Sequence, residues 1–339
     1  MKALYIVEPG KVELREIDRP KPAAAQVLLK VGLVGFCGGD LNAYRGTFTL
    51  QQYPMIPGHE IGAVIEETGR DVPDSLRPGM KVTVSPYNSC GICAACRRNR
   101  PNACIDNRTM GVRRPGAMTQ YIAADWRDIY ASGKLSLKEL ALVEPLTVGF
   151  HASARGRVES SDTVAVLGCG LVGLGAIAGS ARRQAGVIAV DIDDRKLALA
   201  RKAGASEAVN SGSTNLHEEL QELTGGLGPD VIIEAVGLPQ TFLAAVEEAA
   251  FTGRVVYIGY SKKPVEYQTK LFVQKELDVL GSRNCLGDFP AVIDMLEKGR
   301  FPVDECITKI VPLEEAPRAL KQWEADPAAV TKIMVDVRA

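Results

Sequence analysis

The sequence predicts an α/β protein of two domains: a β-rich domain with long loops, and a doubly wound parallel sheet in which strands and helices alternate. Three observations support this fold class. The chain has 339 residues, more than a single core usually accommodates. Short apolar runs broken by glycine and proline fill residues 1–150. From about residue 162, apolar strand, glycine turn and amphipathic helix repeat in order.

We expect the domain boundaries near residues 150 and 285. Residues 1–150 and 285–339 would form the β-rich domain, with strands at ALYIV, QVLLKVGLVGF, GAVIEE and KVTVSPY. Residues 151–284 would form the parallel-sheet domain, with strands at TVAVL, VIAVD, DVIIE, RVVYI and LDVLG joined by right-handed crossovers. The last apolar run, KIMVDV, is expected to return to the first domain.

Charge and composition limit the classes of partner. The formal net charge is −1 with lysine and arginine spread along the chain, so we expect neither nucleic acid nor a membrane surface as a partner. No apolar segment approaches the length of a membrane span, and the first apolar run is too short for a signal peptide. These features predict a cytoplasmic protein, in which clustered cysteines are metal ligands more often than disulfides.

Four of the eight cysteines form the most specific motif of the chain. Cys90, Cys93, Cys96 and Cys104 follow the pattern Cys-x2-Cys-x2-Cys-x7-Cys in a lobe of about residues 88–106. Four thiolates fill the tetrahedral shell of zinc and leave no vacancy for substrate, so the predicted site is structural. The alternatives are a disulfide pair or scattered buried thiols, which three cysteines spaced i, i+3, i+6 rarely provide.

A glycine motif follows the first strand of the second domain. Gly168, Gly170 and Gly173 lie between TVAVL and a helix-like segment that begins with Leu171 and Val172. This context predicts a dinucleotide site, because the glycines permit a tight turn and a close approach of the pyrophosphate to a helix N-terminus. Asp191 ends the next strand, where an acidic side chain accepts hydrogen bonds from the adenosine ribose and disfavours a 2′-phosphate. NAD is therefore favoured over NADP, and the alternative is a glycine turn that binds no dinucleotide.

A third set of residues suggests a catalytic metal. Cys37 and the pair His59–Glu60 lie in glycine-bounded loops, and Glu144 precedes the switch between domains. A lone cysteine or histidine is more often a packing residue. A catalytic zinc, however, takes three protein ligands of these types and keeps one position open.

Together these motifs, in this order, resemble the zinc-dependent medium-chain alcohol and polyol dehydrogenase family. The stretches VEPLTVGFHA and GSRN are most similar to its sorbitol, galactitol-phosphate and sugar-acid dehydrogenase members. The resemblance implies a GroES-like catalytic domain and a Rossmann domain, two zinc ions per chain, and a homo-dimer or homo-tetramer.

The resemblance also assigns roles to residues. It makes Cys37, His59 and Glu144 candidate ligands of a catalytic zinc, with Glu60 binding directly or exchanging with water. It implies that Arg283 contacts the substrate. Further residues are implied to lie near the nicotinamide or to line the cofactor groove: Thr147, Val236, Ile258 and Ser282.

The expected activity is zinc- and NAD-dependent oxidation of a secondary alcohol of a polyol or sugar acid to a ketone. Threonine dehydrogenase and simple alcohol dehydrogenase are alternatives within the family, and a non-catalytic regulatory protein that binds NAD and zinc is an alternative outside it. Gly39 and Asn42 favour the last, because they stand where the family has a hydroxyl residue and a histidine that relay the proton. We expect the proton to leave through ordered water instead, assisted by Glu60 or another ionisable group.

Overall fold

The computed structural model describes residues 1–48 and 52–338, which fall into two compact units. Unit 1 comprises Met1–Glu144, Phe289–Gly299 and Val303–Ala339, and unit 2 comprises Pro145–Asp288 and Arg300–Pro302. The division falls within the helix α3 (Leu137–Arg155), which contains Pro145.

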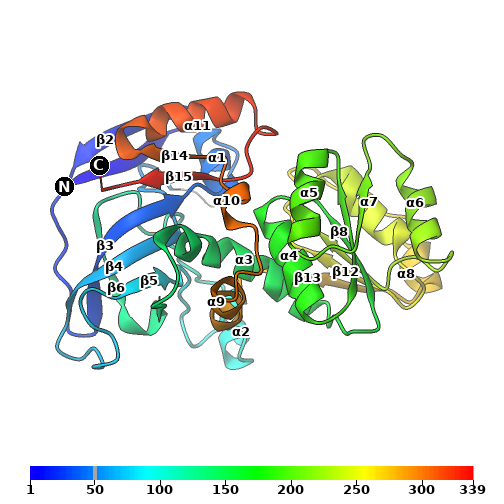
Figure 1. Cartoon of the computed structure of the whole chain (residues 1–339), viewed down its shortest axis with the longest axis horizontal. Coiled ribbons are helices and arrows are strands. Elements are labelled where there is room, and N and C mark those ends of the chain that lie inside the picture. Colours follow the sequence, from blue (N-terminus) through cyan, green and yellow to red (C-terminus); the bar gives the residue numbers. More distant parts are fainter. Residues whose placement is uncertain (49–51, 339) are drawn as a thin grey trace. The chain divides into compact units, whose positions relative to one another are not determined.

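Unit 1 is built on a seven-stranded sheet in the order β14-β15-β3-β4-β5-β7, with β6 also paired to β3 (Figure 1). Its strands are β3 (Gln26–Gly35), β4 (Glu60–Thr68), β5 (Lys81–Val84), β6 (Tyr121–Asp125), β7 (Ile129–Ala131), β14 (Lys309–Pro312) and β15 (Ile333–Asp336). Because β15 pairs antiparallel with β3, the last apolar run of the chain returns to the sheet of the first strands, as the sequence predicts. A separate hairpin joins β1 (Lys2–Glu8) to β2 (Lys11–Glu16).

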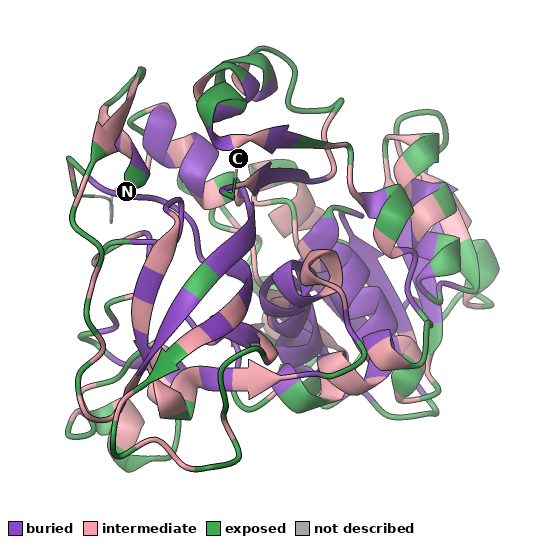
Figure 2. Ribbon diagram, turned by 60° about the vertical axis from the view of Figure 1, so that its left-hand side comes forward, coloured by how far each residue is buried: buried purple, intermediate pink, exposed green. Residues whose placement is uncertain are grey.

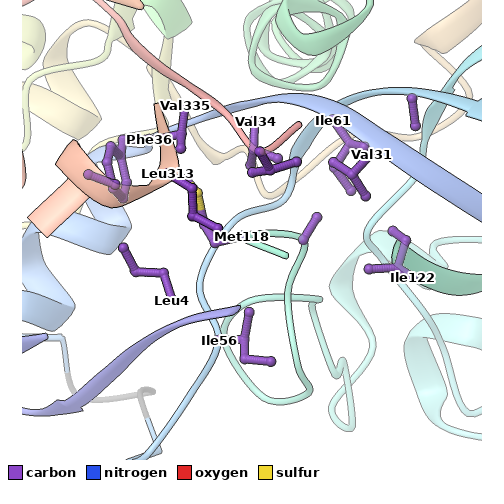
Figure 3. Close-up of a cluster of buried hydrophobic side chains, with 14 of the residues drawn as sticks. Leu4, Val31, Val34, Phe36, Ile56, Ile61, Met118, Ile122, Leu313 and Val335 are labelled. Atoms are coloured by element: carbon purple, nitrogen blue, oxygen red, sulfur yellow. The ribbon is translucent and has the colours of Figure 1, made fainter. Parts of the chain in front are cut away.

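The core of unit 1 draws on segments far apart in the chain. Figure 3 shows Leu4, Val34, Phe36 and Met118 converging with Val335 near the C-terminus. These side chains come from β1, β3, β15 and neighbouring loops, and β3 is buried along most of its length.

The remaining elements of unit 1 are short, apart from two helices. They are α1 (Gly38–Tyr44), α2 (Ala94–Arg97), η1 (Pro101–Ala103), η2 (Trp126–Asp128), α9 (Phe289–Glu297), α10 (Val303–Cys306), η3 (Leu313–Glu315) and α11 (Ala316–Ala325). The helix α11 buries Leu320 and Trp323 in the core of this unit, while Lys321 is exposed.

Unit 2 is a six-stranded sheet in the order β10-β9-β8-β11-β12-β13, in which every pair is parallel. Its strands are β8 (Thr163–Leu167), β9 (Gly186–Asp191), β10 (Glu207–Asn210), β11 (Val231–Glu234), β12 (Arg254–Tyr257) and β13 (Asp278–Gly281). Its other helices are α4 (Leu171–Arg182), α5 (Asp194–Lys202), α6 (Leu216–Leu223), α7 (Pro239–Glu248) and α8 (Lys270–Gln274).

Helices cover both faces of this sheet. Figure 1 shows α4 and α5 on one side and α7 and α8 on the other. In Figure 2 the strands between them are purple, since both faces of a parallel sheet are buried. The strand order reverses beside β8, which is the place where doubly wound sheets bind nucleotides. The predicted fold class, a GroES-like domain and a Rossmann domain, is confirmed.

Candidate metal centre and cofactor site

Three of the predicted zinc ligands lie together in unit 1. One donor atom each from Cys37, His59 and Glu60 lies within 4.8 Å of the others. Cys37 follows β3 and His59 precedes β4, and these two strands pair at Gly35 and Glu60. The sheet register therefore brings together ligands that are about twenty residues apart in sequence.

The loop at Cys37 is fixed by a helix cap. Cys37 is the N-cap of α1: its Sγ accepts a hydrogen bond from Gly39 N at 3.4 Å, and its own N–H donates to Asp40 Oδ2 at 2.8 Å. This reciprocal pair is a capping box built on a thiol in place of the usual hydroxyl. The cap orients the Cys37 sulfur and involves neither His59 nor Glu60.

The surroundings of His59 suit a residue that binds a metal cation. Its ring is buried, and its Nδ1 has no hydrogen-bond partner among the described residues. Burial lowers the pKa of His59, but the hydrogen bond and charge of Cys37 and the charges of Asp40 and Glu144 outweigh it and hold the pKa well above its ordinary value. An orphaned buried nitrogen surrounded by anionic groups fits a bound metal ion.

Glu60 has a partner that sequence reasoning missed. Lys332 Nζ lies 2.6 Å from both carboxylate oxygens of Glu60 and also donates to the carbonyl of Phe36 at 2.8 Å. Burial raises the pKa of Glu60 to about 7, although the charge of Lys332 opposes the rise. Gly35 gives the carboxylate its space, because a Cβ there would lie 2.0 Å from Glu60 Oε2. The only sequence signal for Lys332 is a lysine at the edge of an apolar strand.

Glu144 is also buried and also has an unforeseen partner. Its Oε1 accepts a hydrogen bond from the hydroxyl of Tyr87, which follows β5. Its charge acts on His59, Glu60 and Lys332. Glu144 thus belongs to the same electrostatic environment, but Cys37, His59 and Glu60 form the tighter cluster. Its role as a ligand stays a prediction.

The four-cysteine lobe has the geometry of a thiolate cage. The sulfur of Cys93 lies 3.5 Å from that of Cys96 and 3.9 Å from that of Cys104, and the sulfurs of Cys104 and Cys90 are 3.5 Å apart. Tetrahedral zinc with bonds of about 2.3 Å sets neighbouring sulfurs about 3.8 Å apart, whereas a disulfide needs about 2.05 Å. Hydrogen bonds from backbone amides of Cys96 and Ile105 lower the pKa of Cys93 to about 6, which favours the thiolate.

The glycine turn in unit 2 is tightly constrained. Gly168 has φ +94°, and a Cβ on Gly173 would lie 1.8 Å from the carbonyl oxygen of Gly168. Gly170 is the N-cap of α4, so Leu171 and Val172 begin a helix whose N-terminus receives no side-chain cap in the described chain. Uncapped amides at a helix N-terminus are ready to bind an anion.

Asp191 is tied to the same turn. Its Oδ2 accepts from Cys169 N at 2.7 Å, and its Oδ1 accepts from Ile192 N at 2.8 Å and Asp193 N at 3.1 Å. Three backbone donors hold this carboxylate beside the glycine turn, where a 2′-phosphate would meet its charge.

The other predicted cofactor residues occupy the carboxyl ends of neighbouring strands. Val236 follows β11, Ile258 follows β12, and Ser282 follows β13 with a buried Oγ that has no partner among residues 1–48 and 52–338. Thr147 is buried in α3, and Arg283 is exposed. Val236 is positioned by Glu234, which was not predicted: Glu234 Oε1 accepts from Val236 N at 2.9 Å and Gly237 N at 2.7 Å.

A groove of about 350 Å³ lies elsewhere in unit 1, between β7 and α9. Tyr130, Ile293 and Glu297 are among its lining residues, and it includes none of the predicted ligands. In addition, no described helix is long and apolar enough to cross a membrane.

Comparison with known proteins identifies the family. Residues 23–134 match the alcohol dehydrogenase GroES-like domain, and residues 172–298 match the zinc-binding dehydrogenase domain. The chain is 32% identical to the starvation-sensing protein RspB of Escherichia coli K12, over 99% of both chains. It is 30% identical to the sorbitol dehydrogenase of Bacillus subtilis, over 99% of this chain and 97% of the relative.

A solved structure agrees over the whole length. The complex of the RspB alcohol dehydrogenase of E. coli CFT073 with NADH superposes with a TM-score of 0.91, at 31% identity and 99% coverage of both chains. This chain therefore belongs to the zinc-type medium-chain alcohol and polyol dehydrogenase family. It is an NAD-dependent oxidoreductase of the zinc-binding class, as the sequence predicts.

Proposed function

We propose that this protein oxidises a secondary alcohol of a polyol or sugar acid to the ketone, reversibly, at a zinc site formed by Cys37, His59 and Glu144. The observation that carries the proposal is the cluster of Cys37, His59 and Glu60 donors, with the orphaned Nδ1 of His59 among the described residues. Glu60 is a fourth ligand or one that exchanges with water.

When bound, zinc supplies Lewis-acid polarisation of the substrate hydroxyl, and NAD accepts the hydride. The protein positions the donors. The capping box of α1 orients Cys37, the hydroxyl of Tyr87 orients Glu144, and Lys332 restrains Glu60. Glu60, Glu144 and Lys332 are buried, which shields these groups from water and strengthens their electrostatic effect.

NAD is the proposed dinucleotide, bound in unit 2. The N-terminus of α4 would bind the pyrophosphate, and Asp191 would accept hydrogen bonds from the ribose. Val236, Ile258 and Ser282 would line the groove beside the nicotinamide ribose, and Thr147 would lie near the nicotinamide.

The side chain of Arg283 is the reason to expect a polyol or sugar acid as the substrate. Its guanidinium can bind a carboxylate or two neighbouring hydroxyls at once, which a simple alcohol does not offer. The relative named sorbitol dehydrogenase acts, by its name, on such a polyol. We infer that polyols and aldonates are better substrates than ethanol or propanol.

The test is NADH fluorescence while a panel of polyols, aldonates, threonine and simple alcohols is added to zinc-loaded protein with NAD. Turnover with a polyol or aldonate is expected, and Cys37→Ser should abolish it while Cys306→Ala, a buried cysteine outside both metal sets, retains it. Arg283→Ala should lower kcat/KM for the best substrate at least tenfold, and Arg201→Ala should not. Ethanol oxidised as efficiently as the best polyol would contradict the substrate class.

The second candidate is a regulatory protein that binds NAD and zinc without turnover. Gly39 and Asn42 favour it, as does the name of the starvation-sensing relative. Tight NADH binding by zinc-loaded protein, with no turnover of any substrate in the panel, would favour this candidate over the dehydrogenase.

A further inference from the structure

Glu234 is a buried carboxylate that has no cation beside it. It is the last residue of β11 and is 0% exposed, and among the described residues no lysine, arginine or histidine forms an ion pair with it. Its Oε2 also has no hydrogen-bond partner in the part of the chain that the structure describes. An unsatisfied buried polar atom costs free energy, so this oxygen lowers the stability of the fold. Departures of this kind from the rules of packing are typical of functional sites.

The other carboxylate oxygen of Glu234 receives several donors. Oε1 accepts hydrogen bonds from Val236 N at 2.9 Å and Gly237 N at 2.7 Å, and the hydroxyl of Thr241 lies 2.7 Å from it. The two amides belong to the loop that joins β11 to α7, so the carboxylate fixes the path of this loop. Val236 is thereby held against the glycine turn, because a Cβ on Gly168 would lie 2.6 Å from Val236 Cγ2.

Glu234 also contacts the loop that follows β12. Its backbone carbonyl accepts hydrogen bonds from Ile258 N at 2.9 Å and Gly259 N at 3.3 Å. A Cβ on Gly259 would lie 2.5 Å from Glu234 Oε2 and 2.5 Å from Gly237 N, so glycine is needed for this close approach. Glu234 therefore joins two loops at the carboxyl edge of the sheet, and these loops carry Val236 and Ile258.

We propose that Glu234 is a positioning residue for NAD, an inference that rests on the proposed cofactor groove: its carboxylate holds both loops in the conformation that binds the dinucleotide. The carboxyl ends of these strands are the edge at which doubly wound sheets bind nucleotides. A simpler role would be to anchor α7 through Thr241, which would affect folding alone. The two roles are distinguishable, because only a positioning residue changes the affinity of the folded protein for NADH.

NADH fluorescence titration of the zinc-loaded full chain tests this role. Glu234→Leu removes the acceptor for all three donors, so the Kd for NADH should rise about tenfold or more. Glu234→Gln keeps an acceptor oxygen for them, and its Kd should stay within about threefold of that of the natural chain. Thr241→Val removes only the contact with α7 and should leave the Kd unchanged. An unchanged Kd in Glu234→Leu, or an equal rise in Glu234→Gln or Thr241→Val, would overturn the proposal.

Asp162→Asn is the matched control for a loss of stability. Asp162 is a buried carboxylate at the same sheet, but it accepts a hydrogen bond from Arg254 at the amino ends of β8 and β12, on the edge opposite to the groove. This variant should unfold at a lower temperature in the absence of cofactor and bind NADH as the natural chain does. If it lost affinity for NADH as Glu234→Leu does, the effect of Glu234 would be one of stability and the proposal would fail.

Gly173→Ala separates a failure of this proposal from a failure of the proposed groove. A Cβ on Gly173 would lie 1.8 Å from the carbonyl oxygen of Gly168, so the substitution distorts the glycine turn and should weaken NADH binding. Normal binding of NADH by Gly173→Ala would refute the groove itself. Normal binding by Glu234→Leu, together with weak binding by Gly173→Ala, would refute only the role of Glu234.

Discussion

The ammonium group of Lys332 lies 2.6 Å from each carboxylate oxygen of Glu60, and the two side chains are only 5% and 1% exposed. The residues are far apart in sequence, and they meet because β15 returns beside β3 while Glu60 begins β4 on the other side. The charge of Lys332 offsets the free-energy cost of burying the ionised carboxylate of Glu60.

Removal of Lys332 should therefore lower the free energy of unfolding. Lys332→Met leaves the Glu60 carboxylate buried without its cation, and a single broken buried pair costs about 3–5 kcal/mol. Adding Glu60→Gln to Lys332→Met should restore most of the lost stability, because the remaining groups are neutral. Thermal unfolding of the four members of this cycle measures the coupling. Equal losses in Lys332→Met and in the exposed control Lys321→Met would contradict the importance of the pair.

The space that Gly35 leaves for Glu60 provides a second test. Gly35→Ala would place a Cβ 2.0 Å from Glu60 Oε2, so the carboxylate must move away from Lys332. We expect a loss of about 1–3 kcal/mol in stability, typical of overpacking. Gly38→Ala is the control, because no described atom lies within 4 Å of a Cβ there. The same thermal unfolding measurement should find Gly38→Ala near neutral; an equally destabilised Gly38→Ala would place the cause elsewhere.

The metal content tests both ligand sets. Elemental analysis of fully loaded protein should find two zinc ions per chain. Cys96→Ser should remove one of them and destabilise the fold, since structural zinc contributes directly to folding. Cys37→Ser should remove the other with a smaller effect on stability. One zinc or none in the loaded natural protein, with no other metal in its place, would refute the two-site interpretation.

Local sequence patterns indicate the candidate ligand sets, whereas they do not indicate the side chains that contact these candidates. The cysteine spacing and the glycine turn are visible because their residues act within one loop. Lys332 and Tyr87 were missed because each reaches its partner only through sheet pairing or chain return, which leaves no motif in the sequence. The helix α3, which runs from Leu137 to Arg155, was also not predicted, and its interior Pro145 is a residue that usually disfavours a helix. The edge strand β10 was not predicted either, since its four residues carry little apolar pattern.

Cofactor preference should depend on Asp191. We expect NAD to exceed NADP in kcat/KM by about a hundredfold, which corresponds to about 2.7 kcal/mol of hydrogen bonding and repulsion. Asp191→Ala should narrow this ratio. Asp191→Asn keeps an acceptor for the amide of Cys169 but loses the charge. This variant therefore shows whether Asp191 acts by holding the glycine turn or by repelling the 2′-phosphate of NADP. A natural enzyme that is equally fast with NADP would refute the assignment.

The absent proton relay can be restored without strain. A Cβ on Gly39 would lie 3.8 Å from Cys37 Sγ and 3.9 Å from Phe48 Cε1, which are ordinary contacts. Serine at this position should therefore fit beside the ligand loop. Asn42 is half-buried, and its side-chain oxygen accepts a hydrogen bond from the hydroxyl of Thr47 at 3.4 Å, so a histidine there would lie close to a hydroxyl.

We expect Gly39→Ser with Asn42→His to add an ionisation near pH 6.5 to the rate of alcohol oxidation, because histidine titrates there. Oxidation releases a proton, so the added base should raise the rate above this pH, where the imidazole is neutral, and leave KM nearly unchanged. Gly39→Ser with Asn42→Gln is the control, since it supplies the hydroxyl without a titrating ring. A pH–rate profile of the three proteins on one substrate decides the point: identical profiles would show that proton release is not controlled at positions 39 and 42.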